Sequence, residues 1–190
     1  MIPVIQLAQS LRFAMKDMQA AKISDFEIVE IINQAASLLY THMGEQHVQY
    51  SMKKKALIVD ASGSATLPVD FLKVHQVGMG NDGNDGIAVP SSYLATVPGT
   101  YRIVGDTFYA PEGVYGLEYY YVPARVKTFA DNLDVPTAMA SYIEQIVLAL
   151  YGNNLEKALA VVKDCTQSLA AREVSHFGNI GPAQVLGGRI

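Results

Sequence analysis

Residues 24–44 read SDFEIVEIINQAASLLYTHMG and predict a long helix. Ser24 is followed three residues later by Glu27, the pattern of a capping box, in which each side chain satisfies a backbone N–H that the helix leaves open. Gly44 marks the expected end of the helix. The apolar residues cover a wide face, so we expect contacts on more than one side. They are Phe26, Ile28, Val29, Ile31, Ile32, Ala35, Ala36, Leu38 and Leu39.

Helices are expected over about residues 4–44, a range that includes this stretch, and over about residues 134–176. Near residue 134, Pro136 suits a first turn because its missing N–H costs little there. Asn153 or Asn154 is expected to cap the last helix. The predicted buried stripe of that helix consists of Leu155, Leu159, Val162 and Leu169.

Between about residues 47 and 129 the apolar period becomes strand-like. Residues 56–59 form a β-type run, and a turn over 61–64 is expected to lead into a returning strand over 65–67. Residues 101–109, with Gly105–Asp106 at the turn, predict a β-hairpin. This order predicts an α+β fold in one domain over residues 1–190. The N- and C-terminal helices would form a bundle with a β-rich insertion and an extended C-terminal tail over residues 177–190.

Tyr119, Tyr120 and Tyr121 follow one another in a predicted long strand, which places aromatic rings on both of its faces. Both faces then need cover. A second β layer would supply it, and so would a neighbouring subunit. The sequence leaves both interpretations open, and these three residues are our candidates for a subunit contact.

Composition excludes several classes of protein. A net charge of −4 over 190 residues lacks the basic stripe that tight nucleic-acid binding requires. The single Cys165 excludes an intramolecular disulfide and a cysteine-based zinc site. No apolar run approaches the roughly 20 residues that span a bilayer, and residues 1–18 do not resemble a signal peptide. We therefore expect a protein made in the cytoplasm, with no membrane partner.

Two motifs suggest chemistry but have simpler explanations. Residues 78–83 read GMGNDG and match the dinucleotide fingerprint, yet residues 84–90, NDGIAVP, cannot begin the helix that this motif requires. Asp82 and Asp85 lack the other carboxylates of a calcium loop, so turn chemistry explains them. We expect no cofactor, no metal and no catalytic residues.

Other reactive side chains also favour structural interpretations. The four histidines show no metal-ligand spacing. Cys165 lies on an apolar helix face, which favours an inert core thiol. Lys53–Lys55 could contact a phosphate or an acidic partner, but a solvated start of a strand is the simpler interpretation. The tail has four glycines and one proline from residue 178 on and cannot form a helix of its own; we expect it to be held by a partner or packed on its own domain.

The order of these signals resembles the head-to-tail adaptor proteins of tailed bacteriophages, including the tail tubular adaptors of short-tailed phages. Three stretches carry the resemblance: the helix Ser24–Tyr40, the turn LPVDFLKV over residues 67–74, and YRIVGD over residues 101–106 followed by YYYVP over residues 119–123. It extends over roughly residues 10–150.

The resemblance implies a structural virion protein that forms a ring of twelve copies below the portal. Such a ring extends the DNA channel at the head–tail junction and provides a platform for the tail tube or nozzle, and DNA passes without specific binding. It also implies that the tail grips the portal protein. The matching residues here are Phe177, Ile180, Val185, Leu186, Arg189 and Ile190.

Two other interpretations remain open from sequence. Another ring-forming tail component, a tail terminator or tube protein, would share the need for contacts between copies. An enzyme, either a small nucleotide-dependent protein using residues 78–83 or a hydrolase, is the alternative from a different class.

Overall fold

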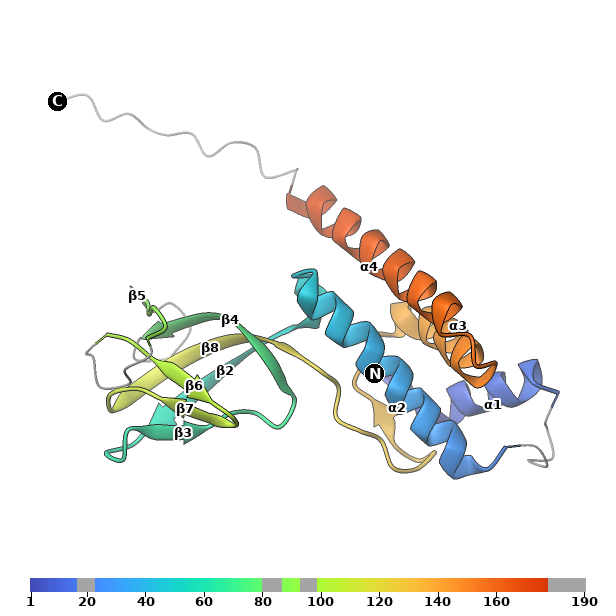
Figure 1. Cartoon of the computed structure of the whole chain (residues 1–190), viewed down its shortest axis with the longest axis horizontal. Coiled ribbons are helices and arrows are strands. Elements are labelled where there is room, and N and C mark those ends of the chain that lie inside the picture. Colours follow the sequence, from blue (N-terminus) through green and yellow to red (C-terminus); the bar gives the residue numbers. More distant parts are fainter. Residues whose placement is uncertain (17–22, 80–86, 93–98, 178–190) are drawn as a thin grey trace, which may run out of the picture.

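The structure is a computed structural model that describes residues 1–16, 23–79, 87–92 and 99–177. These residues form helices and antiparallel sheets, in agreement with the predicted α+β class. Figure 1 shows the larger sheets on one side of the molecule and the α-helices on the other. The helices are α1 (Val4–Ala14), α2 (Asp25–Glu45), α3 (Ala140–Tyr151) and α4 (Leu155–Phe177), with 3₁₀ turns η1 (Gln49–Ser51) and η2 (Thr137–Met139).

Helix α2 begins as its sequence predicts. The backbone N–H of Glu27 donates to Ser24 Oγ at 3.2 Å, and the Ser24 N–H donates to Glu27 Oε2 at 2.8 Å, which confirms the capping box. The prediction was wrong for Phe26, which is 72% exposed because it lies in the first turn, off the buried stripe. That stripe runs through Ile28, Val29, Ile32, Ala35, Ala36, Leu39, Tyr40 and Met43.

Helix α3 contacts α1, α2 and α4 and so lies at the centre of the helical side. Asn154 caps α4, since its Oδ1 accepts from the Lys157 N–H at 2.9 Å. The predicted stripe on α4 is wrong at Leu155 and Leu159, which are 58% and 46% exposed. The buried stripe passes one residue away from Leu159, a rotation of about 100° on a helix. Its members are Ala158, Val162, Cys165, Thr166 and Leu169.

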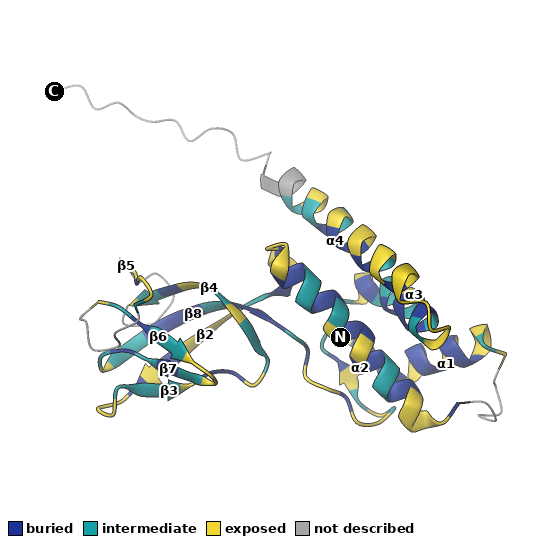
Figure 2. Cartoon of the chain, in the orientation of Figure 1, coloured by how far each residue is buried: buried dark blue, intermediate teal, exposed yellow. Residues whose placement is uncertain are grey.

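Strand β8 (Gly113–Tyr121) is the centre of the largest sheet, whose order is β2-β8-β4-β5. It pairs antiparallel with both neighbours, so Tyr119 lies opposite Lys53 on one side and Val74 on the other. Figure 2 shows β8 coloured as buried along most of its length. The other strands of this sheet are β2 (Met52–Val59), β4 (Phe71–Met79) and β5 (Ile87–Ala88).

A second sheet, of order β3-β7-β6, packs on the first. The predicted hairpin is confirmed in β6 (Arg102–Val104) and β7 (Thr107–Tyr109), with Gly105 at φ +56° in the turn. Phe108 of β7 lies 5.4 Å from the Tyr115 ring of β8, which gives the two-layer arrangement. The predicted β-run over 56–59, the turn and the returning strand are present, but the returning strand does not pair with residues 56–59. After the turn at Gly63, β3 (Ser64–Thr66) crosses to pair with β7 instead of β2.

A short third sheet joins the N-terminal segment before α1 to the segment that precedes α3. β1 (Ile2–Pro3) pairs antiparallel with β9 (Asn132–Leu133), and the Val4 N–H donates to the Asp131 carbonyl at 3.1 Å. Helix α1 therefore starts directly beside the segment that leads into α3. The core built by these elements is continuous, because buried residues of the helices and of the sheets belong to one cluster.

Candidate functional site

The side chain of Lys53 joins the sheet to the helical side of the molecule. Its Nζ donates to Asp70 Oδ2 at 2.8 Å and to Asp134 Oδ2 at 2.7 Å. The same Nζ lies 3.8 Å from the centre of the Tyr121 ring, a cation–π contact. Asp70 directly precedes β4, whereas Asp134 lies between β9 and η2. One cation therefore holds segments that are far apart in the sequence.

The expectation that residues 53–55 form only a solvated start of a strand is therefore wrong for Lys53. Lys54 contacts Glu118 Oε1 at 2.5 Å, but its side chain is 64% exposed, so this pair contributes little. Lys55 is exposed. Alternation along β2 places Lys54 on the opposite face of the sheet from Lys53. Lys55 shares the face of Lys53 but lies two residues further along β2, opposite Leu117 instead of Tyr119.

Tyrosines extend this contact into α2. Tyr119 donates its hydroxyl to Asp70 Oδ1 at 3.0 Å, and Tyr121 donates to the Tyr40 hydroxyl of α2 at 3.4 Å. The rings of Tyr40 and Tyr121 lie 5.0 Å apart and are tilted by 59°. We call this group the junction cluster: Tyr40, Lys53, Asp70, Tyr119, Tyr121 and Asp134.

The three consecutive tyrosines are covered by their own chain. Tyr119, Tyr120 and Tyr121 are 3%, 1% and 6% exposed. Tyr120 points to the opposite face of the sheet, where the rings of His47 and His75 each approach it edge-on at 5.6 Å. This cover comes from α2, from His47 after it and from β4 of the same sheet, and not from the second sheet. A role of these tyrosines in subunit contact stays a prediction.

Burial and hydrogen bonding set the ionisation of the junction cluster. Burial raises the pKa of Tyr119 to about 12, and its hydrogen bond to Asp70 acts in the same direction. Burial also raises the pKa of Tyr40, helped by the Tyr121 hydroxyl. For Lys53, burial would lower the pKa, but the hydrogen bonds and charges of Asp134 and Asp70 outweigh it, so the pKa is raised. Lys53 is therefore a cation and both tyrosines are neutral at physiological pH.

These directions predict a loss of stability at alkaline pH. A tyrosine with a raised pKa keeps its proton in the folded state, while the unfolded chain releases it above about pH 10. The contribution of Tyr119 is therefore present below pH 10 and is lost as pH rises towards 12. We expect Tyr119→Phe to be less stable than the wild type at pH 8 and the difference to shrink by pH 11, measured as melting temperature by circular dichroism. If the difference in melting temperature between Tyr119→Phe and the wild type stayed constant with pH, the raised pKa of Tyr119 would be contradicted.

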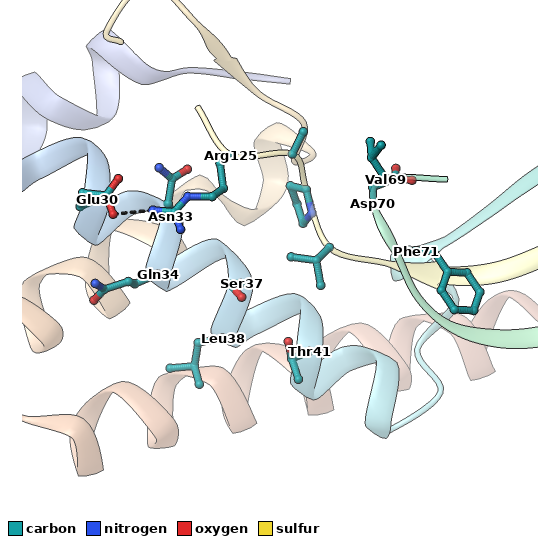
Figure 3. Close-up of a pocket in the computed structure, with 13 residues that line it drawn as sticks. Glu30, Asn33, Gln34, Ser37, Leu38, Thr41, Val69, Asp70, Phe71 and Arg125 are labelled. Carbon is teal, nitrogen blue, oxygen red and sulfur yellow. Dashed lines mark hydrogen bonds and ion pairs between the residues drawn. The ribbon is translucent and has the colours of Figure 1, made fainter. Parts of the chain in front are cut away.

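Beside the junction cluster lies an open groove with a volume of about 640 Å³. Figure 3 shows one wall, formed by side chains of α2, and the opposite wall, formed by the start of β4 and the chain after β8. We call it the α2 groove. It is lined by Glu30, Asn33, Gln34, Ser37, Leu38, Thr41, Val69, Asp70, Phe71, Val122, Pro123, Ala124 and Arg125.

The second wall is held against α2 by Asn33. The Asn33 Nδ2 donates to the Val126 carbonyl and its Oδ1 accepts from the Val126 N–H, both at 2.9 Å. A side-chain amide here replaces the pairing that a neighbouring strand would give. Glu30 of α2 forms an ion pair with Arg125 in the same segment (Figure 3). The segment after β8 is thus held against α2, chiefly by Asn33.

Comparison with protein-family models gives a match to the family described as SU10 adaptor protein, over residues 3–173. The chain belongs to this family. It is a family of phage head-to-tail adaptors, which confirms the resemblance noted from the sequence. A comparison with curated proteins found no match.

Membership in this family indicates the general role of the protein. It is a structural protein of the virion at the head–tail junction, where it interacts with other virion components. A structural family of this kind implies a protein that is not an enzyme. The junction cluster and the α2 groove are therefore features of an assembly protein and are best interpreted as determinants of shape and contact.

Most of the residues expected to contact the portal fall outside the described part of the adaptor. Phe177 is the last residue of α4, so the helix continues one residue past the expected boundary. Ile180, Val185, Leu186, Arg189 and Ile190 lie outside the described residues. Their role stays a prediction that rests on the resemblance.

The glycine-rich stretch over residues 78–83 is described only at its start. Gly78 and Met79 belong to β4 and pair with Ala88 and Ile87 of β5. The chain after this stretch is therefore an antiparallel strand, where a dinucleotide site requires a helix. Asp82 and Asp85 lie outside the described residues.

Cys165 is fully buried in α4, and burial raises the pKa of its thiol to about 12. The thiol is therefore protonated and unreactive at neutral pH.

Within the described ranges, no three His, Cys, Asp or Glu side chains are grouped so that they could hold a metal ion. No helix in the described part of the chain is both long and apolar enough to cross a bilayer.

The sequence did not predict which residues would come together in the junction cluster and in the α2 groove. Asp70 was part of a quoted motif, but no signal connected it with Lys53 or with Asp134, 64 positions further along the chain. Asn33 lies within the predicted apolar helix and was not singled out. A buried polar residue in an apolar face is the signal that could have singled it out, since such groups need a hydrogen-bond partner.

Proposed function

We propose that this adaptor forms a ring of twelve copies that docks below the portal, extends the DNA channel and gives the tail tube or nozzle a platform. The observation that carries the proposal is the family match over nearly the whole chain. The protein acts without covalent chemistry. Its partners are the portal protein, neighbouring copies of itself and a tail component.

The charge of the chain supports a channel that passes DNA without holding it. Each copy carries a net charge of −4, so a closed ring of such copies carries a net negative charge. Such a field repels phosphate. This agrees with transport of DNA through the ring without sequence-specific or tight binding.

Exposed apolar side chains supply candidate contacts between copies. A ring needs heterologous contacts, in which one surface meets a different surface of the next copy. Large apolar side chains that a single chain leaves exposed mark such surfaces. They lie on both the helical and the sheet side and include Phe13, Phe26, Ile58, Leu155 and Leu159. We add these to Tyr119, Tyr120 and Tyr121, which stay candidates for a subunit contact.

Within this proposal the tail reaches the portal through its apolar residues. We expect purified adaptor mixed with the assembled portal to give a ring-on-ring complex with twelve adaptor copies, counted by negative-stain microscopy. The full chain carrying Val185→Asp with Leu186→Asp should lose most of this complex. Gln184→Asp, which adds a charge without removing an apolar group, is the matched control. An adaptor that stays monomeric beside the assembled portal would contradict the proposal.

A further inference from the structure

One wall of the α2 groove offers unused hydrogen-bonding groups. Gln34, Ser37 and Thr41 are spaced three and four residues apart, so they share one face of α2. Within the described part of the chain, their side chains make no hydrogen bond. A row of amide and hydroxyl groups on a helix face can bind the polar backbone of another segment.

The opposite wall offers backbone groups. Residues 122–125 run without helix or strand pairing, and Pro123 fixes an extended geometry in the residue before it. The Val122 N–H donates to the Asp70 carbonyl at 2.9 Å, but the N–H groups of Ala124 and Arg125 have no partner among the described residues. An exposed extended segment of this kind accepts a further extended peptide through main-chain hydrogen bonds.

The charges of the groove are already neutralised within the chain. Glu30 pairs with Arg125, and Asp70 pairs with Lys53. A charged occupant would therefore lose hydration without gaining a free counter-charge. Apolar groups, chiefly Leu38, Val69, Phe71 and Pro123, line the rest of the groove. The geometry fits an uncharged, extended segment with apolar and small side chains.

The C-terminal tail has this chemistry. Residues 178–188 read GNIGPAQVLGG and contain no charged residue, with apolar side chains at Ile180, Val185 and Leu186. Its starting point is close to the groove, because Glu173 near the end of α4 accepts from the Tyr50 N–H at 3.1 Å. Tyr50 lies in η1, which directly follows α2. Glu173 therefore lies beside the chain that follows α2, the helix that forms the first wall of the groove.

The length of the tail is sufficient. The groove follows α2 from Glu30 to Thr41, about 16 Å at helical rise, which about five extended residues span. Residues 178–190 reach about 43 Å when extended. About eight residues thus remain to cross from α4 to the groove.

We infer that the α2 groove binds the C-terminal tail of its own chain before the adaptor meets the portal. The inference rests on the proposed function in one respect, namely that the tail later engages the portal, which must then compete with the groove. Intramolecular binding makes even a weak site effective, because a short tether gives an effective concentration of about 1 mM. The groove would keep the apolar tail from sticking to other chains during assembly.

Disulfide trapping in the full chain tests the inference. Ser37→Cys is combined with Val185→Cys and exposed to air, while the buried Cys165 stays unreactive. We expect an intramolecular disulfide, seen on non-reducing gels as a monomer of changed mobility. Gln167→Cys with Val185→Cys is the matched control, since Gln167 is exposed on α4, and its yield should be at least about fivefold lower.

Charge in the tail gives a second readout. Ile180→Asp with Leu186→Asp should lower the yield of the Ser37→Cys trap at least about fivefold. Equal yields at positions 37 and 167, or a yield that the added charges do not change, would overturn the inference. Disulfide-linked dimers in place of the monomer would assign the groove to the tail of a second copy and overturn binding within one chain. Portal binding is measured separately on the chain without added cysteines, so the proposed function can fail while the trap succeeds, and the reverse.

Discussion

Lys53→Met should destabilise the adaptor by about 3 kcal/mol. The change removes the cation that Asp70 and Asp134 share and the contact of that cation with the Tyr121 ring. Asp70 is only 15% exposed at its side chain, so its charge would stay buried without a counter-charge, the expensive outcome when one member of a buried pair is removed. Solvent screens Asp134, which is 47% exposed, so the cost falls mainly on Asp70. Chemical denaturation monitored by circular dichroism measures the loss.

Two variants make this expectation specific. Lys55→Met changes the same residue type two positions along the same strand, but Lys55 is exposed, so we expect a change of less than about 0.5 kcal/mol. Adding Asp70→Asn to Lys53→Met removes the uncompensated charge and should recover a good part of the loss. If Lys55→Met costs as much as Lys53→Met, the junction cluster does not hold the sheet to the helices.

Local sequence signals predicted the elements that local interactions build. The capping box at Ser24 and Glu27, the cap at Asn154 and the turn at Gly105 each involve residues at most three positions apart. Their physical causes are contained in a short window, so a sequence displays them. The errors on helix faces, at Phe26 and Leu159, arose where a neighbouring helix decides which side is covered.

Pairings across the chain could not be predicted in the same way. The sequence predicted a long strand through Tyr119–Tyr121, but not that β2 and β4 would flank it. The return of the chain after Gly63 to a different sheet depends on Phe108 finding Tyr115, 45 or more positions away from that turn. The junction cluster and the α2 groove belong to this second class. The groove is assembled from α2, the start of β4 and the chain after β8, and the junction cluster also draws on β2 and β8.

Asn33→Leu should cost about 3 kcal/mol, although it replaces a polar residue with an apolar one in a helix face. Asn33 is 7% exposed and pairs with both backbone groups of Val126 at 2.9 Å. Leucine would leave the buried N–H and C=O of Val126 without partners, and each such group costs about 1–3 kcal/mol. For a chain of this size the expected fall in melting temperature is about 8 °C.

The matched control and the rescue decide whether the amide pairing is responsible. Asn132→Leu makes the same change at an exposed position and should leave stability within about 0.5 kcal/mol. Asn33→Asp keeps the acceptor for the Val126 N–H but loses the donor, and at low pH a protonated carboxyl regains an O–H donor. We therefore expect Asn33→Asp to approach the wild type in stability as the pH falls from 7 towards 4. If Asn33→Leu proves as stable as Asn132→Leu, the segment 122–126 is held by its apolar contacts alone, and the α2 groove loses the anchor that fixes its second wall.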